Sequence, residues 1–198
     1  MKRIVIDPGH GGQDSGAVGG GLRESDVVLS IAYKVRDILK RNFDVYMTRD
    51  SDTFVSLNYR SSYANNLGDV AAFVSIHCNS ASSTSATGWE IFTSKGETEA
   101  DALAASIGKR YAARFTIPAR GLKEANFSVL QHTNMPAVLV ECCFLSNAEE
   151  AKWIYSDEIQ QQHAEAIADG IIDHFGLDNK PALTLEQRVA RLEKHLLI

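Results

Sequence analysis

Four side chains could together bind a metal ion and move a proton: His10, Glu24, His77 and Glu141. His10 and His77 each follow a short apolar run, residues 4–6 and 71–76, that is typical of a buried strand. Because strand exits converge at one edge of a parallel sheet, we expect the two imidazoles to lie close together. Glu141 ends a third such run, where a carboxylate is costly to bury unless it meets a cation or hydrogen-bond donors. A structural ion pair is the alternative for Glu141.

The loop between His10 and Glu24 contains six glycines. Glycine this dense costs backbone entropy, but it allows a tight loop that brings His10 and Glu24 to one point. A phosphate-binding loop is disfavoured, because there is no lysine and neither G-x-x-x-x-G-K-[ST] nor G-x-G-x-x-G is present. Two interpretations stay open. One is a surface loop with an incidental histidine, in which the negative charge of Glu24 interacts favourably with the dipole of a helix that begins there. The other is a divalent metal site that needs a further ligand.

Two imidazoles and one carboxylate are the protein ligands of a catalytic zinc ion, which keeps one position for water. A second carboxylate can then accept a proton from that water and deliver it to a leaving amine. The spacing does not decide which of Glu24 and Glu141 is the ligand and which is the base. The H-E-x-x-H pattern of helix-borne metalloproteases is absent from the sequence.

The chain has 198 residues, enough for one α/β domain with a full core. Its net charge of −5 argues against a protein that binds nucleic acid by charge. No apolar run approaches the roughly 20 residues that a transmembrane helix needs. Asp7 and Pro8 end the first apolar run too early for a signal peptide. We therefore expect a protein made in the cytoplasm without a leader and not inserted in a membrane.

The cysteines, Cys78, Cys142 and Cys143, are odd in number and include no C-x-x-C, which fits neither a disulfide framework nor a thiolate zinc site. We expect small buried apolar side chains, with a catalytic cysteine as the alternative. The remaining histidines do not follow strands, and we expect them at or near the surface: His132, His163, His174 and His195.

Apolar periodicity predicts alternating strands and helices, as in an α/β domain. Strands are expected at residues 4–6, 43–48, 71–76, 88–94, 128–132 and 137–140. Helices are expected at residues 25–41, 57–67, 97–115, 148–155 and 158–175. Residues 118–127 are polar and predict an irregular lid or substrate-facing loop.

The sequence predicts a main domain at residues 1–176 and a linker with a short amphipathic helix at residues 177–198. Within the second unit, apolar residues recur at steps of 4, 3 and 4, as in a coiled-coil seam: Leu185, Val189, Leu192 and Leu196. A helix of about 14 residues is marginal by itself in water. We expect it to pair with a second copy of the chain, and docking on the main domain or on a missing further module are the alternatives.

Several stretches of the sequence occur in the order of a known family. They are I-D-P-G-H-G-G-x-D-x-G-A, the glutamate after the glycine loop, L-x-x-R-x-x-x-A-N, F-V-S-I-H-x-N, R-G-L-K and P-A-V-L-V-E-x-x-F-L-S-N, between residues 6 and 147. Here the chain closely resembles the zinc-dependent N-acetylmuramoyl-L-alanine amidases of the Amidase_3 family, of the phage endolysin or bacterial autolysin type. The family usually has glycine at the position of Cys143, a departure that we expect to alter packing.

The resemblance implies an α/β fold with a mixed, mostly parallel sheet of about six strands and helices on both faces. It implies that His10, Glu24 and His77 bind one Zn²⁺ and that Glu141 is the catalytic carboxylate. A set of further residues lies in the matching stretches and is expected to bind substrate: Arg60, Asn79 and Arg120.

The reaction that the resemblance implies is hydrolysis of the amide between the lactyl group of N-acetylmuramic acid and L-alanine in peptidoglycan. An enzyme made without a leader would reach the wall after release by a holin or by lysis of the mother cell. Two alternatives are a zinc peptidase or deacylase that acts on another amide, and a non-catalytic wall-binding module.

Overall fold

A six-stranded sheet forms the centre of the protein in the computed structural model, which describes residues 1–96 and 98–177. The strand order is β4 (Phe43–Met47), β1 (Lys2–Pro8), β5 (Val70–Asn79), β8 (Ala137–Phe144), β6 (Trp89–Thr93) and β7 (Ala119–Glu124). Neighbouring strands are parallel except β6 and β8, which are antiparallel. The predicted mixed, mostly parallel α/β fold is therefore confirmed.

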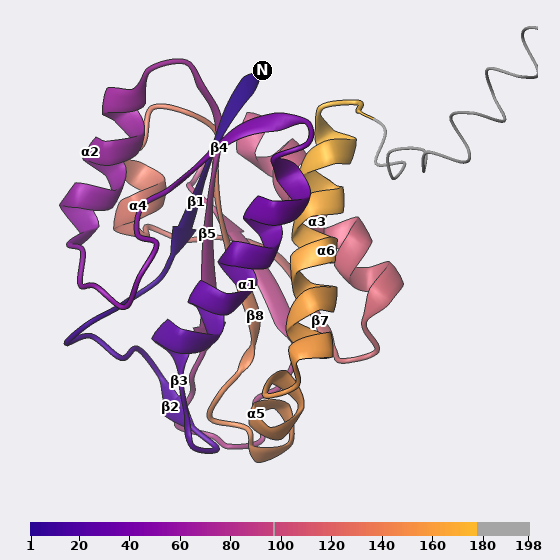
Figure 1. Ribbon diagram of the computed structural model, residues 1–198. Coiled ribbons are helices and arrows are strands. Elements are labelled where there is room, and N and C mark those ends of the chain that lie inside the picture. The colour runs from indigo at the N-terminus through magenta and orange to yellow at the C-terminus, as the bar shows by residue number, and fades with distance from the viewer. Residues whose placement is uncertain (97, 178–198) are drawn as a thin grey trace, which may run out of the picture.

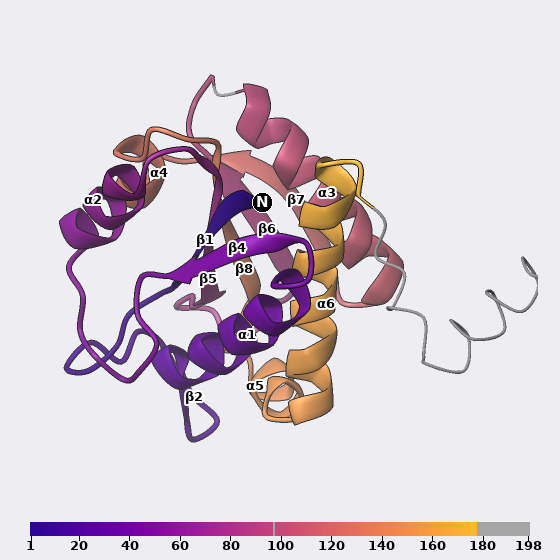
Figure 2. The ribbon, with the colours of Figure 1, turned by 45° about the horizontal axis from the view of Figure 1, so that its top comes forward.

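Helices cover both faces of the sheet (Figures 1 and 2). One face carries α1 (Glu24–Leu39), α3 (Thr98–Arg114) and α6 (Asp157–His174), which enclose the larger hydrophobic core. The other face carries α2 (Leu57–Leu67) and α4 (Ser128–Gln131), over a smaller core. The short helix α5 (Ala148–Ile154) lies beside the hairpin of β2 (Val18–Gly19) and β3 (Leu22–Arg23) at the lower end of Figure 1.

The alternation of side chains along the central strand β5 determines on which face of the sheet His77 lies. Val74 and Ile76 pack in the larger core beneath α1, whereas Phe73 packs in the smaller core beneath α2. Successive side chains of a strand point to opposite faces, so His77 shares the face of Phe73. On β8, Leu139 packs in the smaller core, and Glu141, two residues on, shares that face. His77 and Glu141 are also register partners on neighbouring strands.

Two predicted elements were wrong. Residues 128–132, expected as a strand, form α4 with Val129 and Leu130 buried in the smaller core, because one apolar pair does not distinguish a strand from a helical turn. Residues 118–127, expected as irregular, include β7, which pairs with β6 at the edge of the sheet. Most β7 residues are exposed or half-buried, so the strand carries little apolar alternation that the sequence could reveal.

The strands that hold the site are longer than predicted, because β5 and β8 continue past His77 and Glu141. His77 and Glu141 therefore lie within the paired part of their strands and not beyond it. In the described part of the chain, no helix combines the length and the apolar character needed to cross a membrane. The predicted C-terminal helix, with its seam of Leu185, Val189, Leu192 and Leu196, lies outside the described residues.

Candidate metal centre

The turn that carries His10 is held by two buried arginines. His10 has φ of 59°, a left-handed conformation that is uncommon outside glycine. Arg60 donates to the carbonyl oxygens of Pro8 at 2.6 Å and of His10 at 2.7 Å. Arg49 donates to the carbonyl oxygens of Pro8 at 3.0 Å and of Gly9 at 2.8 Å. These bonds offset the local strain and fix the direction in which the imidazole of His10 points.

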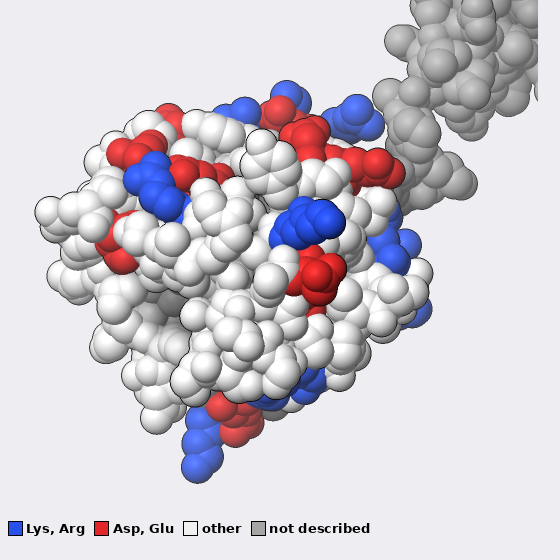
Figure 3. Space-filling model, turned by 90° about the horizontal axis from the view of Figure 1, so that it is seen from below, with Lys and Arg blue, Asp and Glu red and all other residues white. Residues whose placement is uncertain are grey.

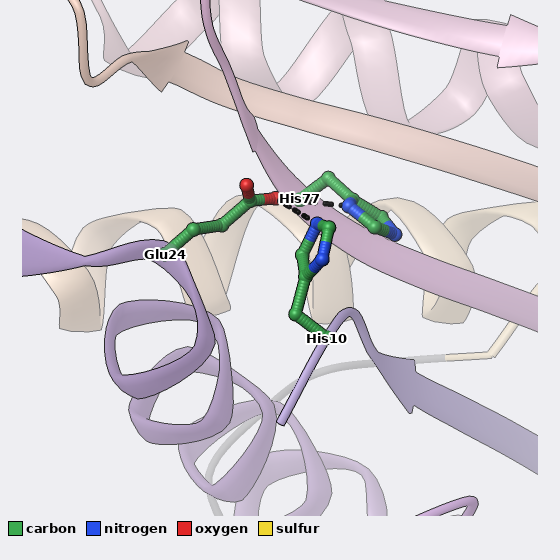
Figure 4. A group of neighbouring side chains, drawn as sticks. All are labelled: His10, Glu24 and His77. Carbon is green, nitrogen blue, oxygen red and sulfur yellow. Dashed lines mark hydrogen bonds and ion pairs between the residues drawn. The ribbon is translucent and has the colours of Figure 1, made fainter. Parts of the chain in front are cut away.

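Three side chains from different elements converge at this turn (Figure 4). Glu24 is the first residue of α1, and its Oε1 lies 3.2 Å from His10 Nε2 and 2.9 Å from His77 Nδ1. One ligand atom from each of the three residues lies within 4.8 Å of the others. Two imidazole nitrogens and a carboxylate oxygen are the donor set of a catalytic zinc site, so the residues fit such an ion.

Hydrogen bonds and charge keep the carboxylate of Glu24 in its anionic form. Burial alone would raise the pKa of Glu24, but the hydrogen bonds from His10 and His77 outweigh it and hold that pKa far below its usual range. The amides of Ala17 and Cys78 also donate to the carboxylate, at 2.8 and 2.9 Å. Glu24 therefore stays ionised, as a metal ligand must.

The missing side chain of Gly9 makes room for His77. A Cβ added at Gly9 would lie 2.2 Å from His77 Cε1 and 2.5 Å from its Nε2. We expect Gly9→Ala to displace the imidazole and weaken zinc binding by about 10–100-fold, the range typical for loss of a ligand's support. Metal titration by calorimetry measures this change. The matched control is Gly108→Ala in α3, where the nearest atom would be 3.4 Å away, and equal zinc affinity in the two variants would contradict the packing argument.

Asp14 orients His10 from the opposite side. Its Oδ2 lies 3.0 Å from His10 Nδ1, which leaves Nε2 for a metal. Burial lowers the pKa of His10, but hydrogen bonds and charges from Glu24 and Asp14 outweigh burial and raise that pKa above its usual value. Protons therefore compete with a metal for His10 as the pH falls through this raised pKa.

We expect Asp14→Ala to reduce zinc affinity at pH 8 by about 10–100-fold, because the imidazole loses its orienting acceptor. The same change removes a negative charge that favours protonated His10, so proton competition should begin at a lower pH than in the unmodified protein. Zinc titrations between pH 8 and pH 5 measure both effects. Asp173→Ala, which removes an ion-pair partner of Arg110, is the control, and an Asp14→Ala curve that matches it would show that Asp14 has no orienting role.

Glu141 lies beside the three converging side chains in a cleft of about 730 Å³. Its Oε2 is buried and, among the described residues, has no hydrogen-bond partner. Burial raises the pKa of Glu141 well above its usual value, and the negative charge of Glu24 adds to the shift. No cation pairs with Glu141 in the described part of the chain, so the alternative of a structural ion pair is not supported. A carboxylate with this setting can hold and release a proton.

The residues expected to bind substrate lie in two places. Arg60 lines the cleft, but four of its hydrogen bonds go to protein oxygens, including the buried carboxylate of Asp7. Asn79 on β5 and Arg120 on β7 both donate to the carboxylate of Glu90 on β6. Their contact with substrate stays a prediction.

Sequence reasoning missed several polar residues around the site: Asp14, Arg49, Glu90 and Lys123. Asp14 had a readable signal, since it follows His10 by four residues within the glycine loop. The roles of Arg49, Glu90 and Lys123 depend on contacts between segments that lie far apart in the sequence.

The cysteines are free and buried, as predicted, and all three pack in the larger core. The surface position predicted for His163 was wrong: it is fully buried in α6, where its Nδ1 lies 3.1 Å from the Tyr111 hydroxyl. His163 also stacks on Phe115, with ring centroids 4.3 Å apart. A helix position facing the core explains this burial, because an aromatic imidazole can replace an apolar side chain there.

Comparison with known proteins assigns the chain to a family. A sequence profile described as N-acetylmuramoyl-L-alanine amidase, Amidase_3, matches residues 4–173. The chain therefore belongs to the Amidase_3 family.

Individual relatives support the same assignment. N-acetylmuramoyl-L-alanine amidase LytC of Bacillus subtilis (strain 168) is 38% identical over 177 residues, which cover 88% of this chain and 36% of LytC. The endolysin of Bacillus phage SPP1 is 38% identical over 189 residues, which cover 90% of this chain and 68% of the endolysin. The solved catalytic domain of CwlV, an N-acetylmuramoyl-L-alanine amidase from Bacillus (Paenibacillus) polymyxa var. colistinus, is 40% identical with a TM-score of 0.85. The match covers 90% of this chain and 100% of that domain.

Proposed function

We propose that this protein is a zinc-dependent N-acetylmuramoyl-L-alanine amidase that hydrolyses the amide between N-acetylmuramic acid and the L-alanine of the stem peptide. The observation that carries the proposal is the convergence of His10, Glu24 and His77 within 4.8 Å, next to Glu141, whose Oε2 has no hydrogen-bond partner among the described residues. Membership in the Amidase_3 family supports the substrate.

Each residue of the proposed site has its own role in the reaction. When bound, zinc would polarise the scissile carbonyl and lower the pKa of a water to about 7. His10, Glu24 and His77 would hold the ion, and Asp14 would keep the imidazole of His10 in the correct tautomer. The carboxylate of Glu141 would accept a proton from the attacking water and donate it to the nitrogen of the departing L-alanine.

A two-part assay tests the proposed function against its alternatives. Metal analysis of the purified protein should give about one zinc per chain, and incubation with purified cell walls should lower turbidity and release new amino groups of L-alanine. Wall binding with neither change would indicate a non-catalytic wall-binding module. Zinc with hydrolysis of other amides, but none of the muramoyl amide, would indicate a different zinc peptidase or deacylase.

The setting in which the protein acts is part of the proposal. We propose that peptidoglycan is its partner and that it acts on the wall once a holin or cell lysis has released it, as the similarity to a phage endolysin suggests.

Viewed from the end where β2, β3 and α5 lie, charged side chains of both signs form small groups with uncharged surface between them (Figure 3). Self-association through residues 184–197 stays a prediction, because these residues lie outside the described part of the chain.

A further inference from the structure

A buried glutamate, Glu90, stands next to Glu141 on the side away from the metal ligands. Glu90 on β6 is the register partner of Glu141 on β8, and directly opposite residues of an antiparallel pair share one face of the sheet. In the sheet order β5, β8, β6, β7, His77 therefore lies on one side of Glu141 and Glu90 on the other. The side chain of Glu90 is 4% exposed.

Two cations of the edge strand β7 reach the same carboxylate oxygen. Arg120 Nε lies 3.3 Å from Glu90 Oε2, and Lys123 Nζ also donates to Glu90 Oε2. Asn79 donates to the other oxygen, Oε1, at 2.5 Å. Arg120 also lies over the ring of Phe144 at 4.9 Å, which limits where its guanidinium can point.

A bulge in β7 places both cations on this face. Residues three apart in a regular strand point to opposite faces. Trp89 pairs with Ala119 and Glu90 with Gly121, so Arg120 is an extra residue that reverses the alternation. Gly121 has φ of 87°, and a Cβ there would meet nothing within 4 Å, so the glycine is needed for its conformation and not for space. Bulges are frequent beside active sites, where they redirect a side chain.

The cluster has more positive charge than Glu90 neutralises. Arg120 and Lys123 together carry two positive charges against the single negative charge of Glu90. Their side chains are 38% and 37% exposed, and Arg120 uses one of its five N–H donors on Glu90. The free donors of a guanidinium match a carboxylate in bidentate geometry.

We propose that Arg120 and Lys123 form a subsite for the carboxylate of the second stem-peptide residue, the one that follows L-alanine. This inference rests on the proposed function. In this proposal Glu141 protonates the leaving nitrogen, and the peptide extends from Glu141 across β6 towards β7. Two extended residues span about 7 Å, and neighbouring strands lie about 4.8 Å apart. The second stem-peptide residue is therefore within reach of Arg120 and Lys123, whose side chains extend from β7 to Glu90 on β6.

The test compares two substrates that differ by one charge. Purified peptidoglycan with D-glutamate as its second stem residue is compared with peptidoglycan in which that residue is amidated to D-isoglutamine. New L-alanine amino groups are quantified to give kcat/KM for each. The unmodified protein should prefer the acidic form by about tenfold, in line with one or two charge-assisted hydrogen bonds at a partly exposed site. In Arg120→Gln/Lys123→Met the ratio of the two values should fall close to one.

The control double variant is Lys40→Met/Lys109→Met, which removes the exposed charge of Lys40, just after α1, and that of Lys109 in α3. It should keep the preference. Equal kcat/KM for the two substrates in the unmodified protein would overturn the subsite, and so would a preference that survives in Arg120→Gln/Lys123→Met. Both outcomes leave the amidase activity itself intact. Release of no L-alanine amino groups from either substrate would instead overturn the proposed function and the subsite with it.

Discussion

Glu141→Gln should lower turnover of peptidoglycan by about 10²–10⁴-fold, the usual contribution of a general acid–base group. Glutamine matches the shape of glutamate but cannot accept a proton from water or donate one to the leaving nitrogen. The buried Oε2 of Glu141 has no partner among the described residues, so the substitution breaks no hydrogen bond that the fold requires. Zinc content and thermal stability should therefore stay close to those of the unmodified protein.

Release of L-alanine amino groups measures the turnover of this variant, and metal analysis and thermal unfolding measure its integrity. The control is Glu158→Gln, an exposed glutamate in the first turn of α6, which should keep full activity. Near-normal turnover of Glu141→Gln would show that Glu141 is structural and that another group transfers the proton.

His10→Ala and His77→Ala should each abolish zinc binding and wall lysis together. Three protein ligands leave none to spare, because the fourth position of a catalytic zinc site must stay open for water and substrate. The two imidazoles contact a common oxygen, Glu24 Oε1, so loss of either ring opens the site on one side. Stoichiometric metal analysis and turbidity assays on the same preparations measure both properties.

His174→Ala provides the matched control, since His174 ends α6 and lies away from the cleft that contains Glu141. It should retain one zinc per chain and normal lysis. Stoichiometric zinc in His10→Ala or in His77→Ala would remove that residue from the ligand set. Lysis without zinc in either variant would contradict a metal-dependent reaction.

The four central residues could be predicted because each has a local signal in the sequence. His77 and Glu141 interrupt apolar runs that form the buried strands β5 and β8, and parallel pairing of these strands brings their polar ends together. Glycines around His10 indicated a tight turn, and Gly9 is indeed needed where the ring of His77 approaches the backbone. The strand alternation needed for the α/β fold was visible for the same reason, since fully buried parallel strands are continuous apolar runs.

The supporting residues could not be predicted, because their roles depend on contacts between distant segments. Arg49 and Arg60 hold the turn before His10 from 40 to 53 residues away along the chain. The strand β7 is too polar to show an apolar pattern, and its bulge at Arg120 is invisible without the pairing register. His163 was misplaced for a similar reason, since its burial depends on Tyr111 and Phe115 from α3 and the segment after it.

Mass spectrometry of the products from digested peptidoglycan tests the central claim most directly, because it identifies the bond that is cut. The proposed mechanism predicts glycan strands that keep intact N-acetylmuramic acid with its free lactyl carboxylate, together with stem peptides that begin with L-alanine. Both product classes should disappear when a chelator removes the metal and return when zinc is restored. Products cut between stem-peptide residues or between sugars, with the muramoyl–L-alanine bond intact, would contradict the proposed reaction.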